Sequence, residues 1–83
     1  MSKSIYRNEY RELITRLREG REATGKTQAE VAAKLGLTQA RLSDIERGGR
    51  RLDVLEFIDL CQAIGLDAAS VLSSAVQAGS RKK

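Results

Sequence analysis

The residues best suited to chemistry gather in one stretch, TQARLSDIERGGRR, residues 38–51. If this stretch begins as a helix, the turn of 100° per residue places Leu42 and Ile45 on one side, while Gln39 projects from its start. The opposite side carries small and polar side chains and no large apolar one: Ala40, Ser43, Asp44 and Arg47. Such a face can enter the major groove of DNA, where glutamine can bond the edge of adenine and alanine can pack on a thymine methyl. An ordinary solvated face has the same composition, so these residues alone leave both interpretations open.

The composition of the 83-residue chain excludes several other chemistries. Histidine is absent, which removes the commonest general base and the commonest metal ligand. With one cysteine, Cys61, the chain can form no internal disulfide and no zinc cluster, and we expect a buried, inert thiol there. The GGRR segment at 48–51 lacks the spacing of a P-loop. We therefore expect no catalysis, no metal and no other cofactor, and nothing indicates a small-molecule ligand.

The formal charge of +4 is unevenly distributed along the chain. Residues 1–51 carry twelve Lys and Arg against seven Asp and Glu, giving +5, whereas residues 52–83 carry three against four, giving −1. This basic excess indicates a polyanionic partner, although a solvated basic surface has the same charge. Charges recur every few residues in the N-terminal MSKSIYRNEYREL, so it is neither a signal peptide nor a membrane span. We expect a cytoplasmic protein with no membrane partner.

Five helices are predicted to position these side chains, and no stretch has the alternation of a strand. Apolar spacing and capping residues place them at about 5–24, 27–35, 38–46, 53–64 and 67–78. The first helix has an apolar stripe of Tyr6, Tyr10, Leu13 and Leu17, flanked by Ile14. The fourth has a stripe of Val54, Phe57, Ile58, Cys61 and Ile64, and the fifth carries Val71, Leu72, Ala75 and Val76. The expected fold is one compact all-α domain over residues 1–78, followed by a basic frayed tail at 79–83.

The second and third helices form a unit with a short connection. Thr27 and Thr38 are the expected N-cap residues, and Glu30, three residues after Thr27, completes a capping box. Gly36, between the helices, can adopt the left-handed conformation that a tight connection needs. Two short helices joined in this way describe a helix-turn-helix, although a plain αα-hairpin satisfies the same spacing.

The segment TQAEVAAKLGLTQARLSDIERGGRRLDVLEFIDLCQAIGLD closely resembles the phage-repressor-like (lambda-repressor-like, Xre) helix-turn-helix family. The resemblance extends back through LREGREATGK and covers about residues 10–72. Its ordered marks are G-x-T-Q, the alanine at the fifth position of the second helix, the following glycine, the second T-Q and I-E-x-G. The resemblance implies a five-helix DNA-binding domain that acts as a transcriptional regulator, usually as a dimer.

The resemblance also implies which residues contact DNA. Base reading would fall mainly to Gln39, Ala40 and Asp44, with Ser43 and Arg41 as further candidates. Phosphate contacts would fall to the second helix start, the third helix and the basic run after it: Gln28, Lys26, Lys34, Thr38, Arg41, Arg47, Arg50 and Arg51. The amide of Gln28 would also orient Gln39.

Asp44 departs from this pattern, because the family often has a neutral or basic residue there. Its carboxylate can accept a hydrogen bond from a cytosine amino group. Alternatively, Arg41 or Arg47 holds the carboxylate, which then excludes unsuitable sequences. We favour the second role slightly, and both stay open.

Two further groups of residues have expected roles other than DNA contact. One is an ion pair inside the fold, and the other is a contact between two copies of the chain. Arg21 and Glu46 both lean towards the core, and such a pair also recurs in the family, so we expect an ion pair between the first and third helices. Apolar side chains in excess of one small core predict a homodimer, with candidate contacts at Leu55, Leu60, Ala75 and Val76.

The expected function is that of a sequence-specific regulator, a repressor, bound as a homodimer to double-stranded DNA. A two-fold dimer would place its third helices one DNA turn apart, about 34 Å, on a near-palindromic operator. Two alternatives stay open: an antitoxin-type protein-interaction module of the same fold, and a controller of a restriction–modification system.

Overall fold

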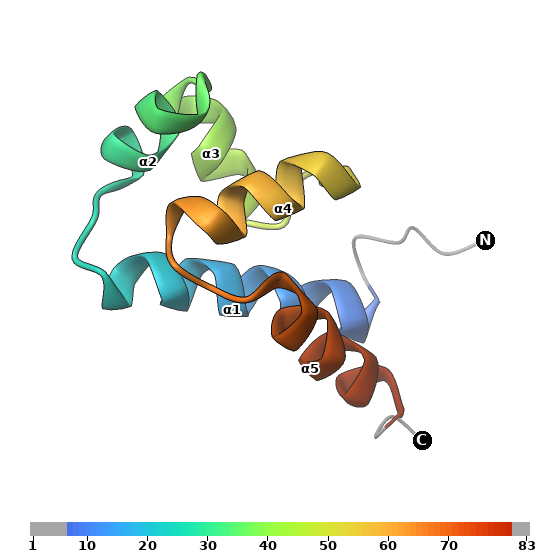
Figure 1. Ribbon diagram of the computed structural model, residues 1–83. Coiled ribbons are helices and arrows are strands. Elements are labelled where there is room, and N and C mark those ends of the chain that lie inside the picture. Colours follow the sequence, from blue (N-terminus) through green and yellow to red (C-terminus); the bar gives the residue numbers. More distant parts are fainter. Residues whose placement is uncertain (1–6, 81–83) are drawn as a thin grey trace.

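The computed structural model describes residues 7–80, which contain five α-helices and no strand (Figure 1). In chain order the helices are α1 (Asn8–Ala23), α2 (Gln28–Leu35), α3 (Gln39–Glu46), α4 (Val54–Ala63) and α5 (Ala68–Ser80). The predicted all-α architecture is therefore confirmed. Tyr6, which the stripe of the first helix includes, lies outside the described residues. The last helix runs through residue 80, into the segment predicted as a tail.

No helix in the described range combines the length and the apolar character that crossing a bilayer requires.

The longest helix, α1, lies between α5 on one side and the group α2–α4 on the other (Figure 1). The helices α2 and α3 pack against each other, and α3 also packs on α1. As a result, α3 is supported from behind, and one of its sides faces solvent.

Side-chain caps explain where the short helices begin. The Thr27 hydroxyl accepts the backbone N–H of Glu30, whose carboxylate accepts the backbone N–H of Thr27, so both halves of the predicted capping box are present. The Thr38 hydroxyl accepts the backbone N–H of Arg41 at the start of α3. Between the two helices, Gly36 adopts φ 72°, a left-handed conformation that side chains with a Cβ disfavour. The turn therefore ends α2 and starts α3 within three residues.

The buried side of α4 differs from the predicted stripe. Phe57, Leu60, Cys61 and Ile64 are buried at intervals of three and four residues, whereas Val54 is 71% exposed. The stripe was thus wrong in including Val54 and in leaving out Leu60. At 100° per residue, Val54 lies to one side of the buried residues of α4, so its side chain faces solvent. One turn later, the side chain of Phe57 reaches the core.

The α4–α5 connection lies close to α1 at Gly20. A Cβ built on Gly20 of α1 would lie 2.7 Å from a methyl carbon of Leu66, so a side chain at position 20 would require the Leu66 side chain to shift. Leu66 itself packs against the core from the connection between α4 and α5. The absence of a side chain at position 20 therefore leaves room for the Leu66 side chain against α1.

Candidate nucleic-acid interface

The outward side of α3 presents small and polar side chains, as its spacing predicts. Gln39 and Ala40 are exposed at the start of the helix, and Ser43 and Asp44 are half-buried one turn later. The inward residues, Leu42 and Ile45, are completely buried. With its N-terminus held by a side-chain cap, α3 presents a polar side whose first residues, Gln39 and Ala40, are exposed to solvent.

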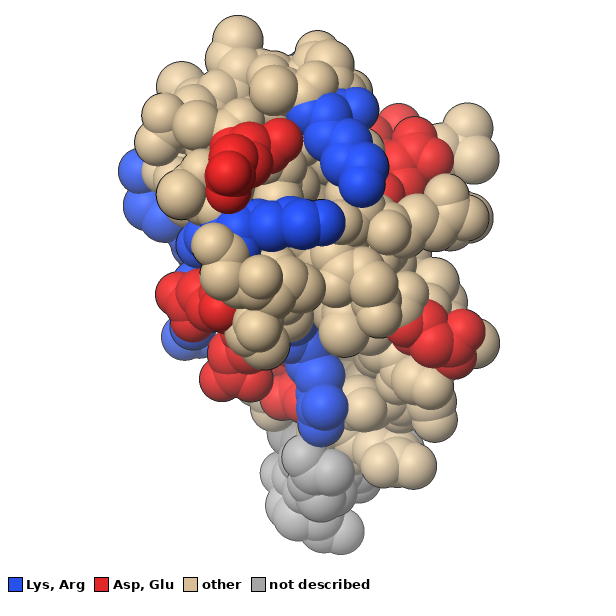
Figure 2. Space-filling model, turned by 60° about the vertical axis from the view of Figure 1, so that its left-hand side comes forward, with Lys and Arg blue, Asp and Glu red and all other residues tan. Residues whose placement is uncertain are grey.

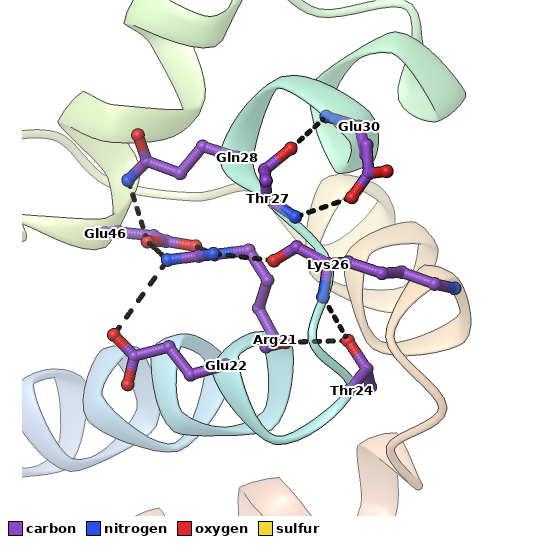
Figure 3. Close-up of polar contacts among 8 residues, drawn as sticks. All are labelled: Arg21, Glu22, Thr24, Lys26, Thr27, Gln28, Glu30 and Glu46. Atoms are coloured by element: carbon purple, nitrogen blue, oxygen red, sulfur yellow. Dashed lines mark hydrogen bonds and ion pairs between the residues drawn. The ribbon is translucent and has the colours of Figure 1, made fainter.

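A buried ion pair joins the C-terminal end of α3 to α1. The guanidinium of Arg21 contacts both carboxylate oxygens of Glu46, with Nε 2.6 Å from Oε2 and Nη2 3.0 Å from Oε1 (Figure 3). The same guanidinium donates to the backbone carbonyl of Lys26 at 2.8 Å. Glu46 is 5% exposed, and its hydrogen bond raises the pKa of Arg21. This pair joins α1, the α1–α2 connection and α3 at one point.

Gln28 belongs to this same cluster. Its amide nitrogen donates to Oε1 of Glu46 at 2.9 Å, so the start of α2 is tied to the end of α3 (Figure 3). The expected role of orienting Gln39 is therefore replaced by a bond to Glu46, because the carboxylate is a stronger acceptor than a neutral amide. One amide hydrogen is left for a phosphate contact.

Arg41 lies beside α4 and not on the outward side of α3. Its Nη2 atom donates to Oε2 of Glu56 at 2.6 Å, and its Nε atom is buried without a hydrogen-bond partner. At 100° per residue, position 41 lies between the outward side and the core, which directs the side chain to α4. The expected base and phosphate contacts of Arg41 therefore do not fit this geometry. The sequence pattern Asp53-x-x-Glu56 signals Glu56 as a capping residue, but nothing in it indicates Arg41 as the partner.

Asp44 is held by Arg47, one of the two partners expected for it. The Nη2 atom of Arg47 lies 3.2 Å from Oδ1 of Asp44, and its Nη1 atom lies 3.2 Å from the Ser43 hydroxyl. The carboxylate is also folded over Gly49, where a Cβ would meet Oδ1 at 2.6 Å. Arg47 is therefore oriented along the outward side of α3.

Two expected phosphate contacts, Lys26 and Lys34, lie beside α4. The Lys26 amine donates to the backbone carbonyl of Ala63 at 3.3 Å, at the negative end of the α4 dipole. Lys34 lines a shallow surface hollow together with Asp59 and Gln62 of α4. The helix α2 packs on α4 as well as on α3, and Lys34 lies on the side of α2 next to α4. On the side that Figure 2 shows, basic and acidic side chains alternate, so no field of one sign covers it.

The basic turn after α3 is exposed and anchored through its backbone. The Tyr10 hydroxyl of α1 donates to the backbone carbonyl of Arg50 at 2.7 Å, and burial raises the pKa of this tyrosine. The side chains of Arg50 and Arg51 are exposed, and within residues 7–80 neither guanidinium has an ion-pair partner. Thr38 uses its hydroxyl oxygen to cap α3, which leaves the hydroxyl hydrogen available to a phosphate.

The candidate dimer contacts separate into exposed and buried residues. Leu55 and Val76 are largely exposed, whereas Leu60 and Ala75 are buried and belong to the core. The assignment of Leu60 and Ala75 to a dimer surface is therefore wrong, because each lies on the side of its helix that packs inward. Leu72 is 47% exposed, so it joins Leu55 and Val76 as apolar surface of α4 and α5.

The described residues contain no group of three or more His, Cys, Asp and Glu side chains that could hold a metal ion. Cys61 is completely buried, and burial raises the pKa of its thiol.

The chain is similar in sequence to known proteins. The family model for helix-turn-helix domains matches residues 17–71. The HTH-type transcriptional regulator y4dJ of Sinorhizobium fredii is 38% identical over 53 residues, which cover 64% of this chain and 69% of that protein. The regulator y4dL of the same bacterium is 36% identical over 62 residues, which cover 75% of this chain and 31% of that protein. The chain thus spans about a third of y4dL.

A solved structure extends the likeness to three dimensions. The XRE-family like protein from Pseudomonas syringae pv. tomato has a TM-score of 0.77 and 45% sequence identity, over 83% of this chain and 84% of that chain. Sequence and fold therefore agree, and the chain belongs to the Xre-type helix-turn-helix family of transcriptional regulators.

Proposed function

We propose that this protein is a sequence-specific transcriptional repressor that places α3 in the major groove of DNA. The observation that carries the proposal is the uncovered polar side of α3, held rigidly from behind by the Arg21–Glu46–Gln28 cluster. The major groove admits an α-helix and presents a distinct pattern of donors and acceptors for each base pair. Gln39, at the exposed start of α3, is the main base-reading candidate, with Ala40, Ser43 and Asp44 beside it.

Phosphate contacts would flank this helix. Arg50 and Arg51 extend from the turn after α3, and Thr38 and Gln28 keep one donor hydrogen each. Arginine matches a phosphate through paired N–H donors, which fixes the protein on the duplex without reading sequence. Arg47 would contribute from the far end of the helix.

A homodimer would give this small domain sufficient specificity. The exposed apolar residues Leu55, Leu72 and Val76 on α4 and α5 support a two-fold contact, because a monomer gains nothing from exposing them. The two α3 helices would then enter major grooves about 34 Å apart on a near-palindromic operator. Repression would follow from occupying promoter DNA in the cytoplasm, and it requires neither catalysis nor a cofactor.

The test is selection of the full chain against random duplex DNA, followed by sequencing and by transcription in vitro from a promoter that carries the selected site. We expect a palindromic site with half-sites about one turn apart, and reduced transcription from that promoter. Enrichment no greater than for non-specific DNA would overturn the proposal, and increased transcription would replace repression by activation.

A further inference from the structure

A second basic feature lies beside the outward side of α3, between α1 and the end of α3. It is a surface hollow of about 250 Å³. Its lining comes from α1 and from the end of α3: Tyr10, Arg11, Ile14, Thr15, Arg18, Glu46, Arg47 and Gly48. Three of these residues are arginines, and none of the three was expected to meet the other two.

The arginines of this hollow are available to a ligand. Arg11 and Arg18 have no ion-pair or hydrogen-bond partner within the described residues. Arg47 contacts Asp44, but this pair is exposed on both sides, with 69% and 43% of the side chains accessible. An exposed pair of this kind contributes little and can exchange partners. Three guanidinium groups therefore surround one space with little to compensate their charge.

The acidic member of the lining does not cancel this charge. Both carboxylate oxygens of Glu46 already accept hydrogen bonds, two from Arg21 and one from Gln28. The Tyr10 hydroxyl is committed to the carbonyl of Arg50. The groups left to meet a ligand are the three guanidinium groups and the Thr15 hydroxyl, which together suit an oxyanion.

We propose that this hollow binds one backbone phosphate of the DNA, so that α1 contributes to the interface beside α2 and α3. This inference rests on the proposed function. The argument for DNA is continuity: Arg47 belongs both to the hollow and to the outward side of α3, so a duplex with α3 in its groove passes the hollow's rim. Gln28, a second expected phosphate contact, lies on the same flank because it shares Glu46 with α1.

The discriminating variant is Arg11→Gln/Arg18→Gln, and its matched control is Arg16→Gln. Arg16 is two residues from Arg18, on roughly the opposite side of α1, where it pairs with Glu12 at 2.9 Å. The measurement is the affinity of the full chain for its selected site between 50 and about 200 mM salt, together with phosphate-ethylation interference. Unchanged thermal unfolding verifies that both variants fold.

We expect the double variant to lose about one unit of salt slope and about tenfold in affinity at low salt, with base preference unchanged. At one phosphate, ethylation should weaken DNA binding by the wild type and have no effect on DNA binding by this variant. The control should keep the wild-type slope and ethylation pattern.

The outcomes separate the two proposals. If the wild type binds its site and the double variant keeps the full slope and pattern, the hollow does not bind phosphate, and the proposed function stands. If instead the variant loses affinity for poly-glutamate peptide alone, the hollow takes an acidic protein segment, and the inference is overturned. A wild-type chain that selects no DNA overturns both.

Discussion

Arg41 on α3 donates to Oε2 of Glu56 on α4 at 2.6 Å. The other oxygen of the same carboxylate, Oε1, accepts the backbone N–H of Asp53 at 3.2 Å and so completes the capping box of α4. One side chain therefore starts α4 and ties it to α3. This relationship gives Arg41 a structural role, in contrast to the DNA contact that the sequence predicts.

The first prediction concerns Arg41. We expect Arg41→Met to leave the preferred base at every operator position unchanged and to lower the free energy of unfolding by about 0.2–1 kcal/mol. The effect is small because 38% of this side chain and 26% of that of Glu56 are accessible to water. Repeating the DNA selection with the variant, and unfolding it in urea, measures both quantities. A changed base preference would show that Arg41 leaves Glu56 when DNA binds.

The second prediction concerns Gln39, which is exposed and has no packing role. Gln39→Ala should leave thermal unfolding unchanged and weaken discrimination at one base pair of each half-site by about 1–3 kcal/mol. Competition among operators with single base-pair substitutions measures this discrimination. A loss of equal size on every DNA sequence would identify Gln39 as a phosphate contact instead.

The third prediction concerns the buried pair. Glu46→Ala leaves the guanidinium of Arg21, 12% exposed, without its main partner, so the free energy of unfolding should fall by about 3–5 kcal/mol. Glu22→Ala is the control, because Glu22 is exposed and lies 4.0 Å from the same guanidinium. Its effect should stay within about 0.5 kcal/mol. Equal melting temperatures for the two variants would contradict a structural role for Glu46.

The fourth prediction concerns the proposed dimer. Val76→Glu should convert the dimer to a folded monomer, because Val76 is 63% exposed and its replacement disturbs no core contact. The neighbouring Gln77→Glu adds the same charge at an exposed polar position and should leave the dimer intact. Sedimentation equilibrium distinguishes the species, and a wild-type chain that sediments as a monomer would refute the dimer.

The fifth prediction concerns alkaline stability. Burial is the main cause that raises the pKa of Tyr10 above its ordinary value of 10.0, so the folded chain holds the phenolic proton more tightly than the unfolded chain. The resulting stability is complete below pH 10 and is lost as the pH rises through the folded pKa. Tyr10→Phe should unfold about 1 kcal/mol more easily at pH 7, because the bond to Arg50 is gone, and should lose less stability above pH 10.

The thiol of Cys61 also titrates in this range, since burial raises its pKa from 9.0. Its contribution is common to wild type and Tyr10→Phe and cancels in the difference between their urea midpoints across pH 7–11. Parallel curves for the two proteins would argue against a buried phenol.

Local signals were enough to predict the five helices. Thr27, Thr38 and Asp53 cap the helices that follow them through bonds spanning three residues, and Gly36 ends α2 by its own backbone conformation. Such interactions are encoded within a few neighbouring positions, so the sequence reveals them without knowledge of the packing.

The side-chain assignments that failed depend on which helix lies alongside. Arg41 and Lys26 looked like surface cations, but each reaches a group on α4 that is distant in sequence. Val54 was predicted to be buried and is exposed, whereas Leu60 was left out of the buried stripe and is buried. Helix spacing alone does not fix the rotation of α4 against the core. The hollow beside α3 was missed for the same reason, since Arg11 and Arg47 meet only after α1 and α3 have packed.

The cluster around Glu46 has a consequence for how such a domain can change its target. The direction of α3 is set by inward contacts, namely the bonds from Arg21 and Gln28 to Glu46 and the burial of Leu42 and Ile45, and none of these residues lies on the outward side. We therefore expect that positions 39, 40, 43 and 44 can be substituted together without changing the orientation of α3. If α3 reads bases as proposed, a change of operator requires substitutions at these four positions only, with the orientation of α3 unchanged.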